Sequence, residues 1–323
     1  MKKTGSLWLL VFLAVPMQSS AAPDGYPTKL IKIIVPWSAG GPADQRSRQL
    51  AERLTRAVGQ PVVVENKPGA SGAIGASAVA KAPPDDYTLL WGTLYDLAIN
   101  PAVDPALGYD PLRDFAPITQ AVSTYLVLDA RPGLGVKSMK ELIALAKAKP
   151  GQLTCGSPGN GTAPHFALEV LKRSASIDII HVAFKGDAPL LADLLGSHVD
   201  IGFNVTTTAL PHIKAGKLVP LAISSQRRLT PFSEVPTMAE VGFPEMEMTL
   251  WGGVLAPAGT PTEIIRRLNA ELVKIIHSPE IREQWASGGA QAVGSSPEEF
   301  AAFIQSEQSR WARLIKQTGV KME

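Results

Sequence analysis

Short apolar segments alternate with longer amphipathic segments along most of the chain. Residues 30–35 are apolar at nearly every position, which predicts a buried β-strand, whereas residues 43–58 carry apolar side chains at helical spacing. Residues 62–65 begin with three valines, as expected for a strand that helices cover on both faces. The alternation predicts an α/β protein with largely parallel sheets.

The predicted elements fall into two series. Residues 111–122 interrupt the alternation, and the segment at residues 125–129 follows where we expect the chain to cross into a second domain. The first series adds a strand at residues 88–91 and helices at 73–81 and 94–100. The second series comprises helices at residues 139–149, 164–174, 188–195 and 209–215 and strands at 153–155, 179–182, 199–204 and 218–224. A return strand at residues 251–257 and helices at 261–277, 279–287 and 297–318 complete the chain.

This order predicts two domains. We assign residues 23–123 together with residues 246–323 to domain 1, and residues 124–245 to domain 2. Because the chain crosses between them more than once, we expect a hinge and a ligand cleft between the two domains.

The first 22 residues have the pattern of a secretory signal peptide. Lys2 and Lys3 precede an apolar run at residues 7–15, and small residues lead to the expected cleavage site after Ala22. The run is shorter than the roughly 20 residues that span a bilayer, so an uncleaved membrane anchor is the disfavoured alternative. We expect an exported, soluble mature protein.

Composition argues against several kinds of partner. Removal of residues 1–22 takes away two lysines, which leaves 29 basic residues against 29 acidic residues and no polybasic run. This nearly neutral chain is not expected to bind nucleic acid. Cys155 is the single cysteine, and the five histidines show no metal-binding spacing, so we expect neither a disulfide, a metal nor a cofactor.

A loop of small residues, Pro36-Trp-Ser-Ala-Gly-Gly-Pro-Ala-Asp44, runs from a strand into a helix. Gly41 suits the N-cap position and Pro42 the first helical turn, and such a helix start presents unpaired N–H groups to an anion. Asp44 is expected to be a structural capping residue, because its charge would repel an anionic ligand. Trp37 is expected either to cover the ligand or to pack in the core. An ordinary strand–helix turn is the alternative for this loop.

Similar loops occur twice more. Gly69-Ala-Ser-Gly-Ala-Ile-Gly75 opens a helix after a neighbouring strand, with Ser71 as its expected N-cap. In the second series, residues 157–162 bring hydroxyl, amide and backbone N–H donors, which suit a carboxylate, and Asn204 ends a further strand. His165 is expected to cap or pack at the following helix start. Loops at the carboxyl ends of parallel strands meet at one edge of a sheet, so each set is expected to face the ligand.

An enzyme is the alternative that Cys155 and His165 suggest, as a thiol nucleophile and its base. We expect Cys155 instead to be a small buried apolar residue, because it ends an apolar strand. The chain has no Gly-x-Ser-x-Gly elbow and no phosphate-binding Gly-x-x-x-x-Gly-Lys loop. No catalytic residue is therefore assigned.

Longer motifs surround these loops. They are Val62-Val-Val-Glu-Asn-Lys-Pro-Gly69, Asp114-Phe-Ala-Pro-Ile118, Ala209-Leu-Pro-His-Ile-Lys-Ala-Gly216 and Leu255-Ala-Pro-Ala-Gly-Thr-Pro261. Together with the loop at residues 36–44 and the Gly159-Asn-Gly161 segment, they resemble the Bug receptors, the TctC-like solute-binding proteins of tripartite tricarboxylate transporters. The resemblance covers essentially the whole mature chain.

The resemblance implies a two-domain periplasmic-binding-protein fold of type II-like topology, with mixed sheets flanked by helices. It also implies that main-chain groups and ordered waters hold ligand carboxylates at the first strand–helix loop, and that the second-domain loop contributes the other contacts. The candidate ligand-binding residues are Trp37, Ser38, Ala39, Gly40, Gly41, Ser71, Ala73, Ile74, Thr93, Ser157, Asn160, Gly161, Thr162 and Asn204.

The function implied is a monomeric periplasmic receptor that closes on a small organic acid anion and delivers it to the permease subunits of a tripartite transporter. This chain has Trp37 where many members have phenylalanine, Pro158 where serine is common, and Asn204 where many carry aspartate. The last change favours a mono- or dicarboxylate, aromatic acids included, over an amino acid. Presentation of the bound acid to a sensor-kinase ectodomain is the alternative, and a secreted thiol hydrolase is a remote one.

Overall fold

The structure is a computed structural model that describes residues 25–320, so the predicted signal peptide lies outside the described residues. The chain begins with β1 (Ile31–Val35), α1 (Pro42–Val58), β2 (Val62–Asn66), α2 (Ala73–Ala80) and β3 (Thr88–Thr93). A π-helix, η2 (Tyr95–Ile99), runs directly into α3 (Asn100–Val103), and a long strand, β4 (Phe115–Ala130), follows. Residues 94–100 were predicted to form one short helix, and the structure divides them between these two elements.

The remaining elements lie close to their predicted positions. The middle of the chain forms α4 (Met139–Ala148), β5 (Thr154–Ser157), α5 (Ala163–Ala175), β6 (Ile180–Ala183), α6 (Asp187–Leu195), β7 (Ile201–Val205), α7 (Thr206–Lys214) and β8 (Val219–Ile223). The last third forms β9 (Thr249–Pro257), α8 (Thr262–Ile276), α9 (Pro279–Ser287), β10 (Ala290–Ala292) and α10 (Pro297–Thr318). Among the described strands, the short β10 alone has no counterpart in the sequence prediction.

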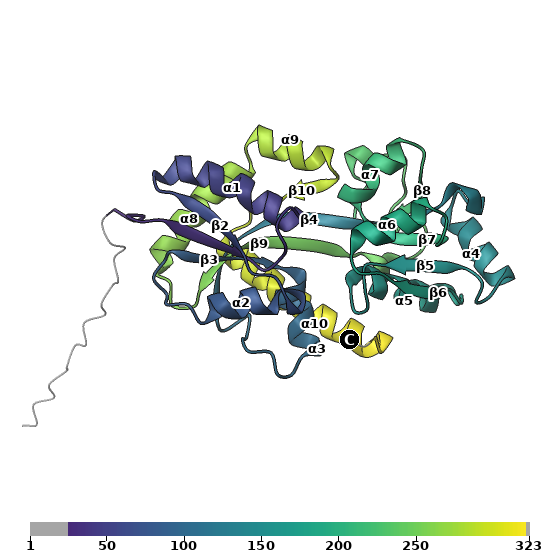
Figure 1. Cartoon of the computed structure of the whole chain (residues 1–323), viewed down its shortest axis with the longest axis horizontal. Helices are drawn as coiled ribbons and strands as arrows, with labels where there is room; N and C mark the ends of the chain where they lie inside the picture. The colour runs from purple at the N-terminus through teal and green to yellow at the C-terminus, as the bar shows by residue number, and fades with distance from the viewer. Residues whose placement is uncertain (1–24, 321–323) are drawn as a thin grey trace, which may run out of the picture.

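Two sheets share the strand β4 (Figure 1). The first sheet has the order β2-β1-β3-β9-β4, with β10 also on β4, and the second has the order β4-β7-β5-β6, with β8 on β4. β1 is parallel to β2 and β3, and β5 is parallel to β6 and β7, whereas β4 and β9 pair antiparallel with their neighbours. The sheets are therefore mixed, and the prediction of largely parallel sheets holds only for their outer strands.

The predicted interruption at residues 111–122 is wrong, because β4 runs through most of it. Pro117 lacks the N–H that a ladder needs, and the register with β9 shifts between Pro117 and Thr119 and again between Gln120 and Val122. The bulges accommodate the proline and allow the strand to continue. Pairing passes from β9 to β7 between Tyr125 and Leu126, close to the predicted domain boundary at residues 123 and 124.

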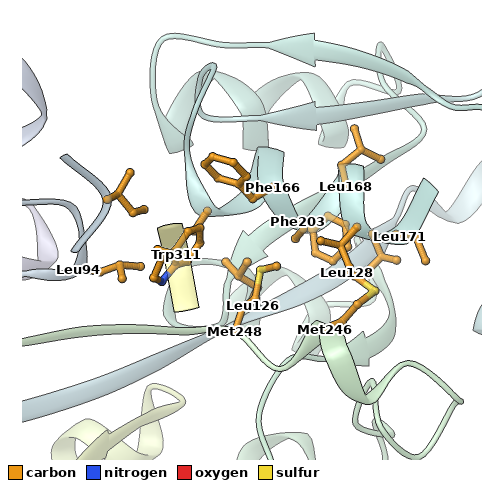
Figure 2. Close-up of a cluster of buried hydrophobic side chains, with 14 of the residues drawn as sticks. Leu94, Leu126, Leu128, Phe166, Leu168, Leu171, Phe203, Met246, Met248 and Trp311 are labelled. Carbon is orange, nitrogen blue, oxygen red and sulfur yellow. The ribbon is translucent and has the colours of Figure 1, made fainter. Parts of the chain in front are cut away.

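Helices cover both faces of the first sheet. Apolar residues of α1 and α8 pack on one face, among them Leu50 and Leu268, while α2, η2 and α10 pack on the other. The core under α2, η2 and α10 continues into the other half of the molecule. Figure 2 shows Trp311 of α10 between Leu94 and Phe166 of α5, and the rings of Trp311 and Phe166 pack edge to face. Because β1, β2 and β3 are parallel, their carboxyl ends lie along one edge of the first sheet.

Candidate ligand-binding site

The loop between β1 and α1 ends in an open helix start. Gly41 is the N-cap residue, with φ −75° and ψ 170°, and no side chain caps the helix from this position. Pro42 follows as the first helical residue, and Ser38, Ala39 and Gly40 are exposed. The first N–H groups of an α-helix have no partner within the helix, so this end carries a partial positive charge that favours an anion.

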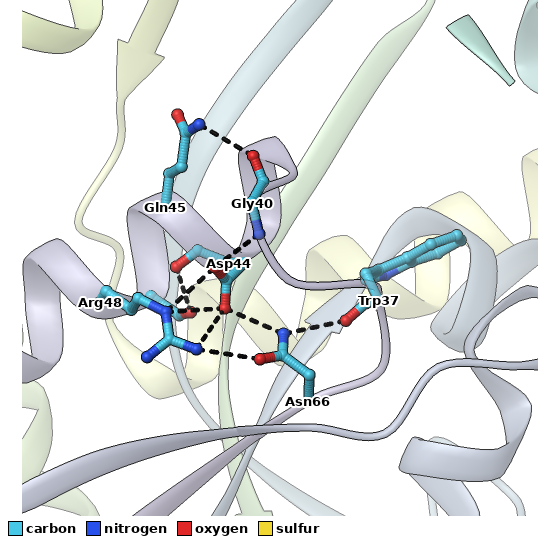
Figure 3. Close-up of polar contacts among 7 residues, drawn as sticks. Trp37, Gly40, Asp44, Gln45, Arg48 and Asn66 are labelled. Carbon is cyan, nitrogen blue, oxygen red and sulfur yellow. Dashed lines mark hydrogen bonds and ion pairs between the residues drawn. The ribbon is translucent and has the colours of Figure 1, made fainter. Parts of the chain in front are cut away.

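Asp44 fixes the shape of this loop (Figure 3). Its buried carboxylate accepts hydrogen bonds from the Gly40 N–H, from the Arg48 guanidinium and from Nδ2 of Asn66, each at 2.9 Å. The same Asn66 amide donates to the Trp37 carbonyl at 3.0 Å. The bond from Arg48, followed by those from Gly40 and Asn66, lowers the pKa of Asp44 to about 2. The Asp44 carboxylate is thus bonded to groups within the loop and its neighbours, and the Gly40 N–H is not free for a ligand.

Trp37 and Tyr95 connect this loop with the other half of the molecule. Their rings pack edge to face with 5.5 Å between centroids, and Nε1 of Trp37 is buried without a hydrogen-bond partner in the described structure. Tyr95 lies beside Ala163, the first residue of α5, and Asp187, the first residue of α6. Burial and the Asp187 carboxylate raise the pKa of the Tyr95 phenol, and the Ala163 backbone opposes the shift. Tyr95 therefore brings the two sets of loops together.

The loop before α2 has an unusual backbone. Residues 69–72 all have positive φ, with values of 129°, 47°, 48° and 92°. Two of the four, Ala70 and Ser71, carry a Cβ and are exposed, and each is strained by about 1–3 kcal/mol. Ser71 lies inside a short turn rather than at its predicted N-cap position, which Gly72 takes.

The start of α2 packs directly on the β1–α1 loop. A Cβ on Gly75 would lie 2.8 Å from Cα of Pro36, so only glycine permits this approach. Ala73 begins α2, and Ile74, which is 56% exposed, lies over Gly69 with its side chain. The structure thus brings the predicted residues of the first half to one edge of the first sheet.

Thr93 ends β3 beneath this loop. Its backbone N–H and its hydroxyl both bond to the buried carboxylate of Asp96, so Thr93 supports the site from below. Burial raises the pKa of Asp96 to about 7, and the bonds from Thr93 act against this shift. A Cβ on Gly72 would lie 3.2 Å from the Asp96 side chain, so the loop rests on this carboxyl group.

The loop between β5 and α5 is held by its own side chains. Ser157 Oγ donates to the Gly159 carbonyl at 3.0 Å, and Thr162 Oγ1 donates to the same carbonyl at 2.7 Å. The Gly161 N–H donates to Nδ1 of His165 at 3.1 Å, which places the imidazole proton of His165 on Nε2. Thr162 is the N-cap residue of α5 without a side-chain cap, and Asn160 is half-buried in the same loop. The hydroxyl groups predicted to face the ligand therefore shape the loop.

Two histidines stack beneath this loop. The rings of His165 and His181 are 3.8 Å apart and inclined by 11°, and Nε2 of His181 lies 2.6 Å from Ser157 Oγ. Burial lowers the pKa of both imidazoles, and the neighbouring His165 contributes to the shift of His181, whose pKa is about 4. Both rings are neutral near pH 7.

Asn204 lies in β7, beside Val127 of β4, and is fully buried. Its Nδ2 donates to Oδ2 of Asp129 at 3.1 Å, and burial raises the pKa of Asp129 well above its ordinary value. Asn204 Oδ1 and Asp129 Oδ1 have no partner in the described structure. Asn204 therefore donates to a buried acid near the end of β7, the strand that pairs with β5.

The structure also bears on a reactive cysteine, a metal site and other hollows. Cys155 is fully buried, and burial raises the pKa of its thiol, which suits an inert apolar residue. Within residues 25–320, His, Cys, Asp and Glu form no group of three that could hold a metal ion. No helix in the same range is both long and apolar enough for a membrane span. Two hollows of about 260 and 270 Å³, one between the segment after β8 and α9 and one between α5 and α10, are lined by none of the predicted ligand-binding residues.

Several residues at the site were missed by sequence reasoning. They are Asn66, Tyr95, Asp96, Asn100 and His181. Two of them carried a signal: Asn100 and His181 are polar residues within short apolar runs, and a polar residue in such a run is expected to be hydrogen-bonded.

Known proteins match nearly the whole chain. A family model described as the tripartite tricarboxylate transporter family receptor, TctC, matches residues 47–320. Protein BugT of Bordetella pertussis is 36% identical over 315 residues, which cover 97% of each chain. This level of identity across both chains confirms the resemblance stated from the sequence motifs.

Solved structures agree with this assignment. Rpa4515 of R. palustris with adipate has a TM-score of 0.82 and 35% identity over 92% of this chain and 99% of its own. MatC from Rhodopseudomonas palustris with bound malate has a TM-score of 0.77 and 29% identity over 90% and 100%, respectively. The predicted periplasmic-binding-protein fold is confirmed, and so is the prediction that the chain is a solute-binding receptor and not an enzyme. The chain belongs to the TctC family of tripartite tricarboxylate transporter receptors.

Proposed function

We propose that this receptor captures a mono- or dicarboxylate between its two sets of loops and delivers it to the permease of a tripartite transporter. The observation that carries the proposal is the open start of α1, where Gly41 leaves the first N–H groups uncapped by any side chain. The adipate and malate bound by the two structural neighbours are both dicarboxylates, which supports the same ligand class here.

The donors at these loops are sufficient for useful affinity. Each hydrogen bond to an ionised carboxylate contributes about 1.5–3 kcal/mol. Four or five such bonds, less the cost of ordering the ligand, correspond to micromolar binding, about −8 kcal/mol. The fixed scaffold around Asp44 keeps that ordering cost low, because the loop does not have to rearrange.

The test is a thermal-shift screen followed by calorimetry with adipate, malate, benzoate and glutamate. A bound ligand raises the melting temperature by mass action, so we expect a shift with at least one of the first three acids and a smaller one with glutamate. Gly41→Val places a side chain at the helix start and should weaken binding at least 100-fold. It should leave the melting temperature nearly unchanged, because a Cβ there meets only the Ser38 carbonyl at 3.5 Å.

Gly108→Val is the matched control, since a Cβ on this exposed glycine also meets only ordinary contacts, at 3.5 Å and beyond, away from the loops. Unchanged affinity in Gly41→Val would remove the α1 start from the site. Failure of every acid in the panel would overturn the proposed ligand class.

A further inference from the structure

The strained loop at residues 69–72 needs a partner that holds it in place. Ala70 and Ser71 adopt a left-handed backbone although both carry a Cβ, and their side chains are exposed. Packing of these side chains therefore does not account for the conformation. Such outliers persist only where surrounding structure imposes them, and they occur often at ligand-binding sites.

Asn100 supplies that partner from below. It is 4% exposed, at the junction of the π-helix η2 with α3, and its Nδ2 donates to the Ser71 carbonyl at 3.0 Å and to the Ala70 carbonyl at 3.5 Å. One buried amide thus contacts both of the strained residues. π-helical turns are themselves frequent at functional sites, which fits the placement of Asn100.

The direction of these two carbonyls decides which donors face outward. In a trans peptide the C=O and the following N–H point in opposite directions. With the Ala70 carbonyl turned down to Asn100, the Ser71 N–H points away from the core, whereas the Gly72 N–H bonds to the Gly69 carbonyl at 3.0 Å. The Ala70 carbonyl also accepts from the Ala73 N–H, so Asn100 and the start of α2 together turn the Ser71 N–H toward the exposed side of the loop, next to the open start of α1.

We propose that Asn100 is a positioning residue that holds residues 69–72 in the left-handed conformation and thereby aims the Ser71 N–H and hydroxyl at the carboxylate ligand. This inference rests on the proposed function for the identity of the ligand. The contact of Asn100 with the Ala70 and Ser71 carbonyls, called the clamp below, involves only the chain and is testable without a ligand. Asn100 does not touch the ligand and acts through the loop.

The first measurement is hydrogen–deuterium exchange of the full mature chain without ligand. Asn100→Ala should raise deuterium uptake in the peptide that covers residues 68–73. Asn269→Ala is the matched control, because Nδ2 of Asn269 also donates to two backbone carbonyls, those of Ile118 and Ser295, at 2.7 and 2.8 Å. We expect this control to leave deuterium uptake in the loop unchanged. If Asn100→Ala also leaves uptake in residues 68–73 unchanged, Asn100 does not clamp the loop.

The second measurement is the affinity for adipate and malate by calorimetry. Asn100→Ala should bind about tenfold more weakly, while Asn269→Ala binds as the parent does. Adding Ala70→Gly to Asn100→Ala should recover about threefold, because glycine adopts positive φ without strain. Failure of the rescue overturns the positioning role.

The outcomes separate the two proposals. If Asn100→Ala loosens the loop but leaves adipate and malate affinity unchanged, the positioning role is wrong and the receptor function stands. If the parent protein binds neither acid, the proposed ligand class fails, and exchange in residues 68–73 still decides whether Asn100 clamps the loop.

Discussion

The starts of α1 and α5 share one backbone arrangement and differ in the chemistry that holds it. In each, the side chain at the third helical position accepts a hydrogen bond from the N–H just before the N-cap residue. Before α1 this is the Asp44 carboxylate with Gly40, and before α5 it is Nδ1 of His165 with Gly161. A carboxylate with a pKa of about 2 stays an acceptor at any physiological pH, whereas an imidazole accepts only while it is neutral. The α1 loop is thus fixed permanently and the α5 loop conditionally.

The largest effect that tests this comparison is expected from Asp44→Ala. The substitution removes the hydrogen bonds from three residues at once, and it leaves the Asn66 amide and the Gly40 N–H without their carboxylate acceptor. We expect the free energy of unfolding to fall by about 2–4 kcal/mol, measured by urea denaturation. Asp44→Asn, which keeps the size and one acceptor oxygen, is the control and should lose about half as much. An alanine variant as stable as the parent would show that the α1 loop does not depend on Asp44.

A pH titration of stability is expected to give the intermediate effect. Because the pKa of His181 falls from 6.5 to about 4 on folding, the unfolded chain binds more protons between these values. Stability from the histidine pair is therefore complete above pH 6.5 and declines as the pH falls toward 4. The pKa of Asp44 is lowered to about 2, so its contribution to folding stability is lost only below pH 4. Melting temperatures between pH 7 and 4.5 should thus respond to the α5 loop and not to the α1 loop.

Two variants separate the pH dependence of stability caused by His181 from that caused by buried carboxyl groups. Asp96, whose pKa is raised to about 7, acts with the opposite sign, because its folded form binds a proton more readily. His181→Gln removes the titrating imidazole and keeps a polar group near Ser157. The difference in melting temperature between the parent and this variant should grow as the pH falls below 6.5. His198→Gln, at an exposed histidine, is the control. Parallel curves for the parent and His181→Gln would show that His181 does not contribute to the pH dependence of stability.

The smallest effect is expected from Arg48→Ala. Arg48 bonds to Asp44 at 2.9 Å, yet its side chain is 51% exposed and the pair is solvated on that side. Exposed ion pairs contribute about 0.2–1 kcal/mol, so we expect a loss below 1 kcal/mol in urea denaturation. A loss as large as that of Asp44→Ala would mean that the ion pair, rather than the bonds to Gly40 and Asn66, fixes the α1 loop.

The order and position of most elements could be predicted from the sequence, because apolar periodicity is a local property. The loop at residues 36–41 was also predictable, since glycine and proline mark a helix start. The continuity of β4 was not, because Pro117 reads as a break and only the bulges next to it show how the strand proceeds. Contacts between distant residues were out of reach as well: Asn100 acts on Ser71 and Tyr95 lies beside Ala163 only after the sheets have formed.

The shared strand β4 has a mechanical consequence for any change in the angle between the two sheets. No loose linker separates the sheets at this point, since Tyr125 still pairs with Thr249 of β9 and Leu126 already pairs with Val205 of β7. A rotation of one sheet against the other must therefore appear as torsion within a hydrogen-bonded ribbon. Such a ribbon resists bending and yields to twisting, so it would restrict the two halves to a narrow arc and return them to the same alignment after each excursion.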